Sequence, residues 1–285
     1  MSDVLDVAEE EEEERAQGSG VIQSVVTAAQ ILEAMAAAAQ PVRLTALAQQ
    51  LGEPKAKIHR HLSTLKFLGF VDQDAQTECY KLAPKLALIG QVAADQLDLR
   101  RLAEPYMMRL RDLTRQTVVL SLPAAGGDSI ANAVVESSDL VTISVRLGYR
   151  LPSYSSAQGR VTLAFSPPEV QQRVLSRKLA ALTPHTIVDP GKLRERLARI
   201  RTQLYDVAMD ETVLGISAVA APIFDFSNKL VAAIGVVGTT QHVHEPVHPE
   251  QLQFLRACTK AISLKLNATA YEELKIPNLR EFIFD

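Results

Sequence analysis

The chain is poor in the residues and patterns that mark exported or membrane proteins. It has two cysteines in 285 residues, Cys79 and Cys258, which lie far apart and show neither metal-ligand nor redox spacing. No uninterrupted apolar stretch comes near the ~20 residues that a membrane span needs. The N-terminus has no basic segment followed by an apolar core, so we expect no secretory signal. These absences predict a reduced, cytoplasmic protein with no membrane partner.

Familiar catalytic motifs are also missing. There is no Ser–His–Asp order, and no Walker loop or GxGxxG lies in a strand–turn–helix context. The alternative to a non-enzyme is a metal-binding enzyme or metallosensor that uses the segment from His242 to His248. This segment contains Pro246 and is followed by Pro249, which predicts an exposed loop rather than rigid metal ligands. We therefore expect no enzyme, no metal and no cofactor.

The formal charge of −3 is distributed unevenly along the chain. Residues 1–20 hold eight acids against Arg15, a charge of −7, which leaves +4 for the remainder; residues 41–70 also carry +4. We expect residues 1–20 to form a disordered, solubilising tail. A compact positive region in an acidic chain predicts a polyanionic partner, and double-stranded DNA fits best.

Residues 21–83 have the pattern of a winged helix-turn-helix. An amphipathic helix over residues 21–39 comes first, and the spacing then predicts a second helix from Ala46 to Leu51, with Thr45 as N-cap and Gly52 after its end. A third helix, about residues 54–68, carries most of the cations. Phe70–Val71 and Cys79–Leu82 flank a polar turn, which predicts a strand–turn–strand wing.

The third predicted helix has one apolar and one cationic face. At about 100° per residue, Ile58, Leu62 and Leu65 fall in a narrow arc that we expect to face the core. The opposite face is small and basic, which suits close approach to base edges and phosphates. A merely solvated charged face, or a winged helix that binds protein, is the alternative. We expect DNA contacts from Lys55, Ala56, Lys57, His59, Arg60 and Thr64, with Tyr80 from the wing.

The rest of the chain mixes strands and helices without a repeating βαβ pattern. We expect a linker helix over residues 84–102, an α+β sensor-like domain over residues 103–267 and an apolar C-terminal tail over residues 268–285, which could dock on its own domain or a neighbouring subunit. Predicted strands include Leu140–Val145 and a late hairpin. A helix is predicted from Ser155 to Phe165.

Three segments resemble the IclR family of bacterial transcriptional regulators, in the family's order. The first is PKAKIHRHL at residues 54–62. The second joins GYRLP and YSSAQGRV, within residues 148–161, and is similar to the family's glycine, proline and ATALGK segment. The third is GISAVAAPIFD at residues 215–225, similar to the segment before the family's final hairpin. The resemblance covers about residues 21–267.

This resemblance implies a winged helix-turn-helix, a linker helix and a GAF-like effector-binding domain, assembled as a homodimer or homotetramer. Members of the family repress or activate genes, commonly for catabolism of a small organic acid or an aromatic compound. The resemblance places the effector pocket at Tyr154, Ser155, Ser156, Gln158, Gly159, Ala208, Ala218, Gly235 and Val237.

At four of these positions the chain departs from the members that sense small acids. Those members place an Asp, a Cys and two Ser where this chain has Ala208, Ala218, Gly235 and Val237. A small anion needs paired donors when it is buried, so we expect an aromatic or longer organic acid in a roomier, more apolar pocket. The serines at the start of the predicted helix either help to hold a carboxylate or serve as helix caps.

Overall fold

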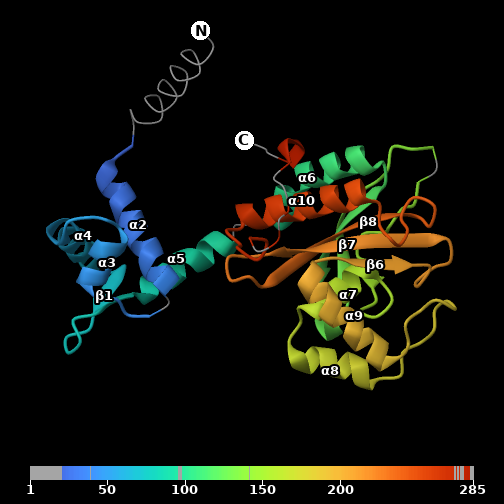
Figure 1. Cartoon of the computed structure of the whole chain (residues 1–285), viewed down its shortest axis with the longest axis horizontal. Coiled ribbons are helices and arrows are strands. Elements are labelled where there is room, and N and C mark those ends of the chain that lie inside the picture. Colours follow the sequence, from blue (N-terminus) through green and yellow to red (C-terminus); the bar gives the residue numbers. More distant parts are fainter. Residues whose placement is uncertain are drawn as a thin grey trace, which may run out of the picture. The chain divides into compact units, whose positions relative to one another are not determined.

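The computed structural model describes residues 21–38, 40–95, 98–140, 142–272, 274, 276 and 279–282. The chain divides into two units between Leu97 and Asp98, and each has its own hydrophobic core (Figure 1). The predicted acidic tail, residues 1–20, lies outside the described residues.

The N-terminal unit is a helical bundle with a short antiparallel hairpin. Ile58, Leu62 and Leu65 are buried in its core, as predicted, beside Ile31 and Leu47. These contacts fix which side of the third helix meets solvent. The elements are α2 (Gln23–Ala38), α3 (Leu44–Gln50), α4 (Lys55–Phe67), β1 (Val71–Gln73), β2 (Tyr80–Leu82) and α5 (Pro84–Asp95).

Helix α3 begins earlier than the sequence predicts. Its N-cap is Arg43, which makes no side-chain capping bond, so Thr45 lies inside the first turn and its prediction as N-cap is wrong. The cause is a bridge between Val42 and Tyr80, whose N–H and C=O groups exchange hydrogen bonds of 2.8 Å. This bridge ends the extended backbone at Arg43. Gly52 follows the helix with φ +64°, as expected.

The predicted linker helix does not run unbroken to residue 102. Helix α5 ends at Asp95 and α6 spans Leu99–Thr114. Asp98 is the N-cap of α6, and its carboxylate accepts a hydrogen bond of 3.2 Å from the Arg101 N–H. Pro105 lies within α6.

The C-terminal unit is an α+β domain built on one antiparallel sheet. Within the described residues the sheet has six strands in the order β5-β4-β3-β8-β7-β6. Helices α6 and α10 cover one face, and α7, α8 and α9 lie on the other (Figure 1). The remaining elements are β3 (Thr117–Pro123), η1 (Ala125–Gly127), β4 (Ser129–Val135), β5 (Arg150–Leu151), α7 (Ala157–Ala164), α8 (Pro168–Ser176), α9 (Pro190–Gln203), β6 (Asp206–Met209), β7 (Ile216–Phe224), β8 (Leu230–Thr239), α10 (Pro249–Lys265) and η2 (Arg280–Phe282).

The predicted strand at residues 140–145 is wrong, because its described residues form no strand. The Thr117 hydroxyl instead donates to the Ile143 carbonyl oxygen at 2.6 Å. A side-chain hydrogen bond therefore attaches this segment to β3, in place of the backbone hydrogen bonds that a strand would form. Ile143 and Val145 are half-buried between exposed neighbours, which is the alternation that suggested a strand. The segment forms one wall of a cavity described below.

The described part of the C-terminal tail docks on its own domain. Tyr271 is buried with Leu204 and Phe224. Its hydroxyl donates to the Pro222 carbonyl oxygen at 2.6 Å and lies 2.9 Å from Thr259 Oγ1. Phe282 joins the core beneath α6 and α10.

Two substitutions in α4 should separate its buried and exposed faces. Leu62 is fully buried and Phe67 is 88% exposed. Leu62→Ala should lower the free energy of unfolding of the N-terminal unit by about 2–5 kcal/mol through cavity formation, and Phe67→Ala by less than about 0.5 kcal/mol. Hydrogen exchange of the α3 and α4 amides measures this unit alone. Equal losses would contradict the packing.

Candidate functional site

Helix α4 presents a basic surface to solvent. Lys55, Ala56, His59, Arg60 and Thr64 are exposed, whereas the buried side of the helix rests on the core. The predicted contact residues on α4 therefore share the accessible side of one rigid element. Because the apolar face of α4 packs on the core, the exposed cations of α4 point toward solvent on the opposite face.

Two of the residues predicted to contact DNA, Lys57 and Tyr80, are not fully exposed. Lys57 is half-buried, and its Nζ lies 2.6 Å from Glu53 Oε1, so part of its charge is neutralised within the helix. Tyr80 is 5% exposed and belongs to the core of the N-terminal unit. Its predicted contact with DNA is wrong, because its ring packs inward while its backbone bridges to Val42.

The wing is a hairpin with an ordered turn. The Asp74 carboxylate accepts hydrogen bonds from the Thr77 N–H and hydroxyl and from the Gln76 N–H. These bonds, chiefly those from Thr77, lower the pKa of Asp74. Lys66 Nζ donates to Gln73 Oε1 at 3.2 Å, which connects α4 to the wing.

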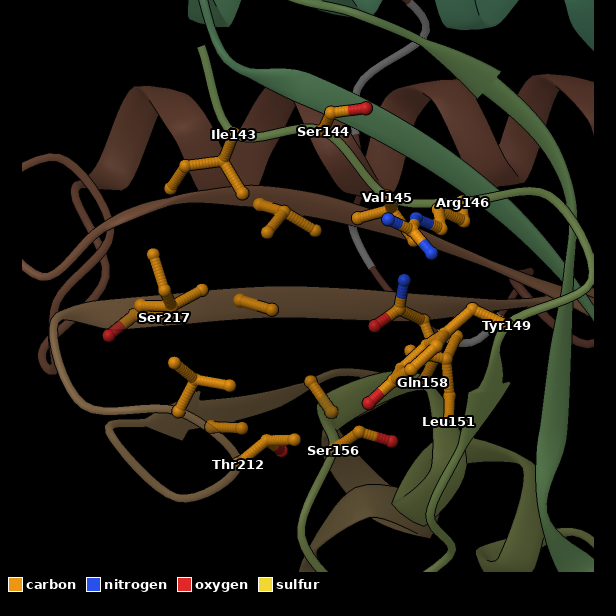
Figure 2. Close-up of a pocket in the computed structure, with 16 residues that line it drawn as sticks. Ile143, Ser144, Val145, Arg146, Tyr149, Leu151, Ser156, Gln158, Thr212 and Ser217 are labelled. Carbon is orange, nitrogen blue, oxygen red and sulfur yellow. The ribbon is translucent and has the colours of Figure 1, made fainter. Parts of the chain in front are cut away.

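The C-terminal unit contains a cavity of about 440 Å³ (Figure 2). Most of its wall is apolar. Strands β6, β7 and β8 supply small side chains, α7 contributes its first turn, and the segment before β5 closes the opposite side. The lining residues are Ile143, Ser144, Val145, Arg146, Tyr149, Leu151, Ser156, Ala157, Gln158, Ala208, Thr212, Val213, Ile216, Ser217, Ala218 and Val237.

Five of the nine predicted effector residues line this cavity. Ala208 is paired with Ala218 across β6 and β7, and Ala218 with Val237 across β7 and β8, so these three form a contiguous apolar patch. Ser156 and Gln158 come from the start of α7. These five residues therefore border one mostly apolar cavity, and their role in effector binding stays a prediction.

The other four predicted residues lie outside the cavity wall, and their predicted place in it is wrong. Tyr154 packs in the buried layer around α7. Ser155 is buried, and its carbonyl accepts a hydrogen bond of 2.9 Å from the Thr212 hydroxyl. A Cβ on Gly159 would lie 2.1 Å from the Pro152 oxygen, so this glycine permits close packing. Gly235 lies beneath the Gln158 side chain.

Ser156 acts as a helix cap. It is the N-cap of α7, and its hydroxyl oxygen accepts from the Gly159 N–H at 3.1 Å. The same hydroxyl donates to the Pro152 carbonyl oxygen at 2.8 Å. Its hydrogen-bonding capacity is therefore largely used within the protein, which favours the capping interpretation over the carboxylate one.

Sequence reasoning missed the wall formed by residues 143–149 and the contribution of Thr212 and Val213. The first stretch has the apolar alternation of a strand, which predicts a place in the sheet. Nothing in the local sequence marks Arg146 as a cavity residue, because its place depends on the tertiary contacts of a segment that is not a strand.

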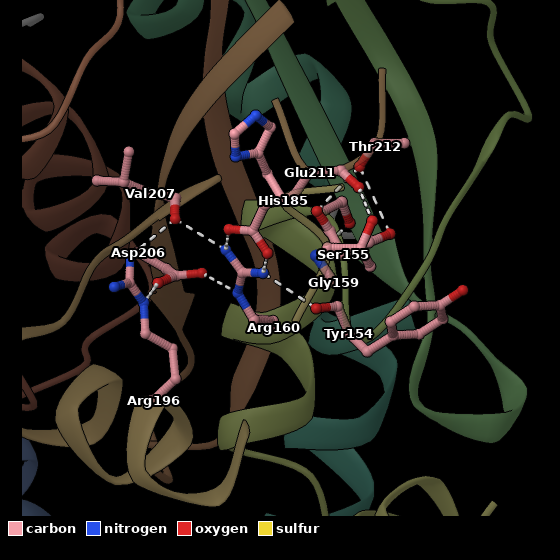
Figure 3. Close-up of polar contacts among 12 residues, drawn as sticks. Tyr154, Ser155, Gly159, Arg160, His185, Arg196, Asp206, Val207, Glu211 and Thr212 are labelled. Carbon is pink, nitrogen blue, oxygen red and sulfur yellow. Dashed lines mark hydrogen bonds and ion pairs between the residues drawn. The ribbon is translucent and has the colours of Figure 1, made fainter. Parts of the chain in front are cut away.

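Next to the cavity, a cluster of buried charges joins α7, β6 and the turn after β6 (Figure 3). Arg160 is fully buried; its Nε lies 2.5 Å from Asp206 Oδ2, and its two Nη atoms lie 2.6 and 2.9 Å from the Glu211 oxygens. Its Nη atoms also donate to the Tyr154 and Val207 carbonyls. Arg196 from α9 pairs with the other Asp206 oxygen at 2.5 Å.

The neighbouring carboxylates stabilise the positive charge of Arg160 in the folded state. Burial by itself would lower the pKa of Arg160, but the carboxylates of Asp206 and Glu211 outweigh burial and raise it above its ordinary value. All of its N–H directions have acceptors. The cluster therefore holds the N-terminal part of α7 against β6, and both elements line the cavity.

The histidine-rich segment does not form a metal site in the part of the chain that the structure describes. No group of three or more His, Cys, Asp or Glu residues is arranged there to hold an ion. His242 Nδ1 instead lies 2.8 Å from the Thr239 hydroxyl, and His248 is the N-cap residue of α10. The metal-based alternative thus has no geometric support.

Among the described helices, none combines the length and apolar character that a bilayer crossing demands.

Comparison with known proteins gives matches to both units. The family described as "Bacterial transcriptional regulator IclR C-terminal" matches residues 91–264, and the "IclR helix-turn-helix domain" matches residues 24–75. The chain is 33% identical over 224 residues to an uncharacterised HTH-type transcriptional regulator, RhmR, of Escherichia coli K12, covering 78% of this chain and 85% of that protein.

Solved structures share the fold. Pseudomonas aeruginosa HmgR superposes with a TM-score of 0.71 and 27% identity, covering 87% of this chain and 99% of that one. An IclR homologue from Microbacterium hydrocarbonoxydans, solved in complex with 4-hydroxybenzoate, gives a TM-score of 0.55 at 23% identity, covering 86% of this chain and all of that one.

Removal of the buried guanidinium should destabilise the C-terminal unit strongly. Arg160→Met leaves Glu211 without its partner and Asp206 with Arg196 alone, which should cost about 3–5 kcal/mol of unfolding free energy. Arg150→Gln is the control, because the Arg150 side chain is exposed although it pairs with Asp128 at 3.0 Å; this change should cost less than about 1 kcal/mol. Urea denaturation measures both. Similar losses would refute a structural role for the cluster.

Proposed function

We propose, since the chain belongs to the IclR family of bacterial transcriptional regulators, that it binds operator DNA through α4 and responds to an organic acid held in the C-terminal cavity. The chain is a transcriptional regulator and not an enzyme. The observation that carries the DNA half of the proposal is the exposed basic face of a helix whose other face is buried. We place the protein in the cytoplasm, where its DNA partner lies.

DNA binding follows from charge and shape together. Lys55 and Arg60 are exposed cations on α4, and Ala56 between them leaves room for close approach to a groove. Arg60 can donate to phosphate or to guanine, and His59 and Thr64 extend the same polar surface. A helix of this kind in a winged helix-turn-helix enters the major groove. The rival function, protein recognition by the same surface, predicts weak dependence on salt.

The ligand half of the proposal rests on the cavity. Its volume of about 440 Å³ falls within the range of small-molecule sites. Ala208, Ala218 and Val237 give it an apolar floor that suits a ring or a hydrocarbon chain. The structural relative that carries 4-hydroxybenzoate suggests the same chemical class. We therefore assign this regulator an aromatic or longer organic acid, and genes for the catabolism of such a compound as its targets.

We also propose that the chain works as a homo-oligomer through α5. None of the described side chains of this helix is buried, and Leu88, Ile89 and Val92 are 66%, 48% and 49% exposed. A helix of this length is marginal in water unless an apolar face is covered. A second copy supplies a matching apolar face by symmetry.

Removal of the Arg60 charge tests the DNA half. The substrate is a duplex selected from a random pool by the unmodified protein. Arg60→Ala should weaken binding by about tenfold, since one phosphate or guanine contact is lost. The slope of the logarithm of the binding constant against the logarithm of the salt concentration should also become shallower by about one. Arg199→Ala, an exposed cation on α9, is the matched control and should leave both quantities unchanged. Unchanged affinity in Arg60→Ala would count against the placement of α4 on DNA.

A charge on α5 tests the oligomer. Ile89→Glu should convert the assembly to monomers at micromolar concentration, because it places a carboxylate in an apolar contact. Light scattering after size exclusion measures the mass. Leu264→Glu on α10 is the control, because its exposure of 43% is close to that of Ile89; its mass should equal that of the unmodified protein. An unaltered mass for Ile89→Glu would rule out this interface.

A further inference from the structure

One polar side chain of the cavity wall is buried without a partner. Gln158 is 1% exposed, and its Nε2 has no hydrogen-bond partner. Figure 2 shows its amide nitrogen pointing into the cavity. A buried amide that donates to nothing is costly, and native proteins seldom keep one without a reason.

The strand beneath this amide is shaped to admit it. A Cβ added to Gly235 would lie 2.2 Å from Gln158 Nε2 and 2.4 Å from its Cδ. Any other residue at 235 would displace the amide.

Three of the serine and threonine hydroxyl groups of the wall are bonded within the protein. Ser144 donates to Glu136 at 2.6 Å, Ser156 caps α7, and Thr212 donates to the Ser155 carbonyl. Ser217 Oγ also lacks a partner, but it lies on a strand between Ile216 and Ala218. Because alternate strand residues face opposite sides, its side chain points away from the cavity surface that these neighbours form.

Arg146 supplies charge on the same side as the Gln158 amide. It reaches in from the segment before β5 (Figure 2). Its guanidinium is exposed and has no hydrogen bond or ion pair with any residue that the structure describes. A guanidinium and an amide N–H2 together match the two oxygens of one carboxylate.

We infer that Gln158, admitted by Gly235, and Arg146 hold the carboxylate of the effector, and that its apolar body lies on Ala208, Ala218 and Val237. This inference rests on the proposed function and specifies which acids fit: those with one carboxylate at the end of an otherwise apolar body. Sugar acids are excluded, because their hydroxyl groups would meet an apolar floor without partners.

Binding of matched probes tests the ligand class. The full-length protein is titrated with benzoate, phenylacetate and octanoate, and with benzamide as the uncharged counterpart of benzoate. At least one acid should raise the melting temperature and bind measurably by calorimetry, because a ligand of the folded state stabilises it. Benzamide should bind at least tenfold more weakly than benzoate, since it cannot pair with Arg146.

Substitutions in the wall test the residues. Gln158→Leu should weaken the acid that binds best by at least tenfold, while the melting temperature without ligand stays equal to or rises above that of the unmodified protein. Arg146→Met should weaken the same acid by a similar factor. Arg173→Met on α8, an exposed arginine outside the cavity wall, is the control and should bind as the unmodified protein does.

A glycine substitution tests the positioning of the amide. Gly235→Ala should weaken the acid and lower the melting temperature, because the new methyl group displaces Gln158. Combination with Gln158→Ala should restore the melting temperature, since the clash is gone, yet leave acid binding weak.

Different outcomes overturn different statements. Tight binding of an acid that Gln158→Leu leaves unchanged would refute this inference and leave the organic-acid effector standing. Equal binding of benzamide and benzoate would refute carboxylate recognition. Failure of all the acids to bind would refute both this inference and the ligand half of the proposed function.

Discussion

The buried guanidinium of Arg160 is the interaction on which the C-terminal unit depends. It lies between two carboxylates and two backbone carbonyls, and the guanidinium itself has no access to water. A charge in such a place is tolerated when every hydrogen-bonding direction is satisfied. The partners of Arg160 come from different elements of the chain. The hydrogen bonds and ion pairs of Arg160 therefore fix the positions of these elements relative to one another. The wall of the cavity follows from that arrangement, because the lining residues Ala208 and Thr212 come directly after Val207 and Glu211, which bind Arg160.

The two units use charge in opposite ways. In the N-terminal unit the cations of α4 stay in water, and apolar contacts of Ile58, Leu62 and Leu65 set their direction. Long-range attraction to a polyanion needs this exposure. In the C-terminal unit the positive charges of Arg160 and Arg196 are internal and balance the negative charges of Asp206 and Glu211. They give geometry to a ligand site instead of attracting a partner.

Periodicity predicted the elements whose faces are set by burial. Helix α4 and the β7–β8 hairpin were found because their apolar residues recur at the expected spacing. The errors arose where tertiary contacts overrule local pattern. Thr45 is a good N-cap residue, but a bridge between Val42 and Tyr80 places the helix start two residues earlier, with Arg43 as the N-cap. The alternation at Ile143 and Val145 resembles a strand, yet side-chain bonding holds that segment outside the ladder.

The cavity was predictable as a region and unpredictable in its polar contacts. The family resemblance placed Ala208, Ala218 and Val237 on neighbouring strands, and their pairing makes one apolar patch. The resemblance gave no means to separate wall residues from the residues packed behind them, such as Tyr154 and Gly159. That separation depends on side-chain direction, which a motif does not encode.

Gln158 and Gly235 illustrate why single positions mislead. When Gly235 is considered by itself, the absence of a polar side chain at this position predicts a less polar pocket. In the structure this glycine leaves the space that the Gln158 amide occupies. The polar group at this place is therefore carried by the helix, beside a strand position that has no side chain. A site of this kind must be interpreted by which side chains touch, because the chemistry presented to a ligand belongs to the pair and not to either residue.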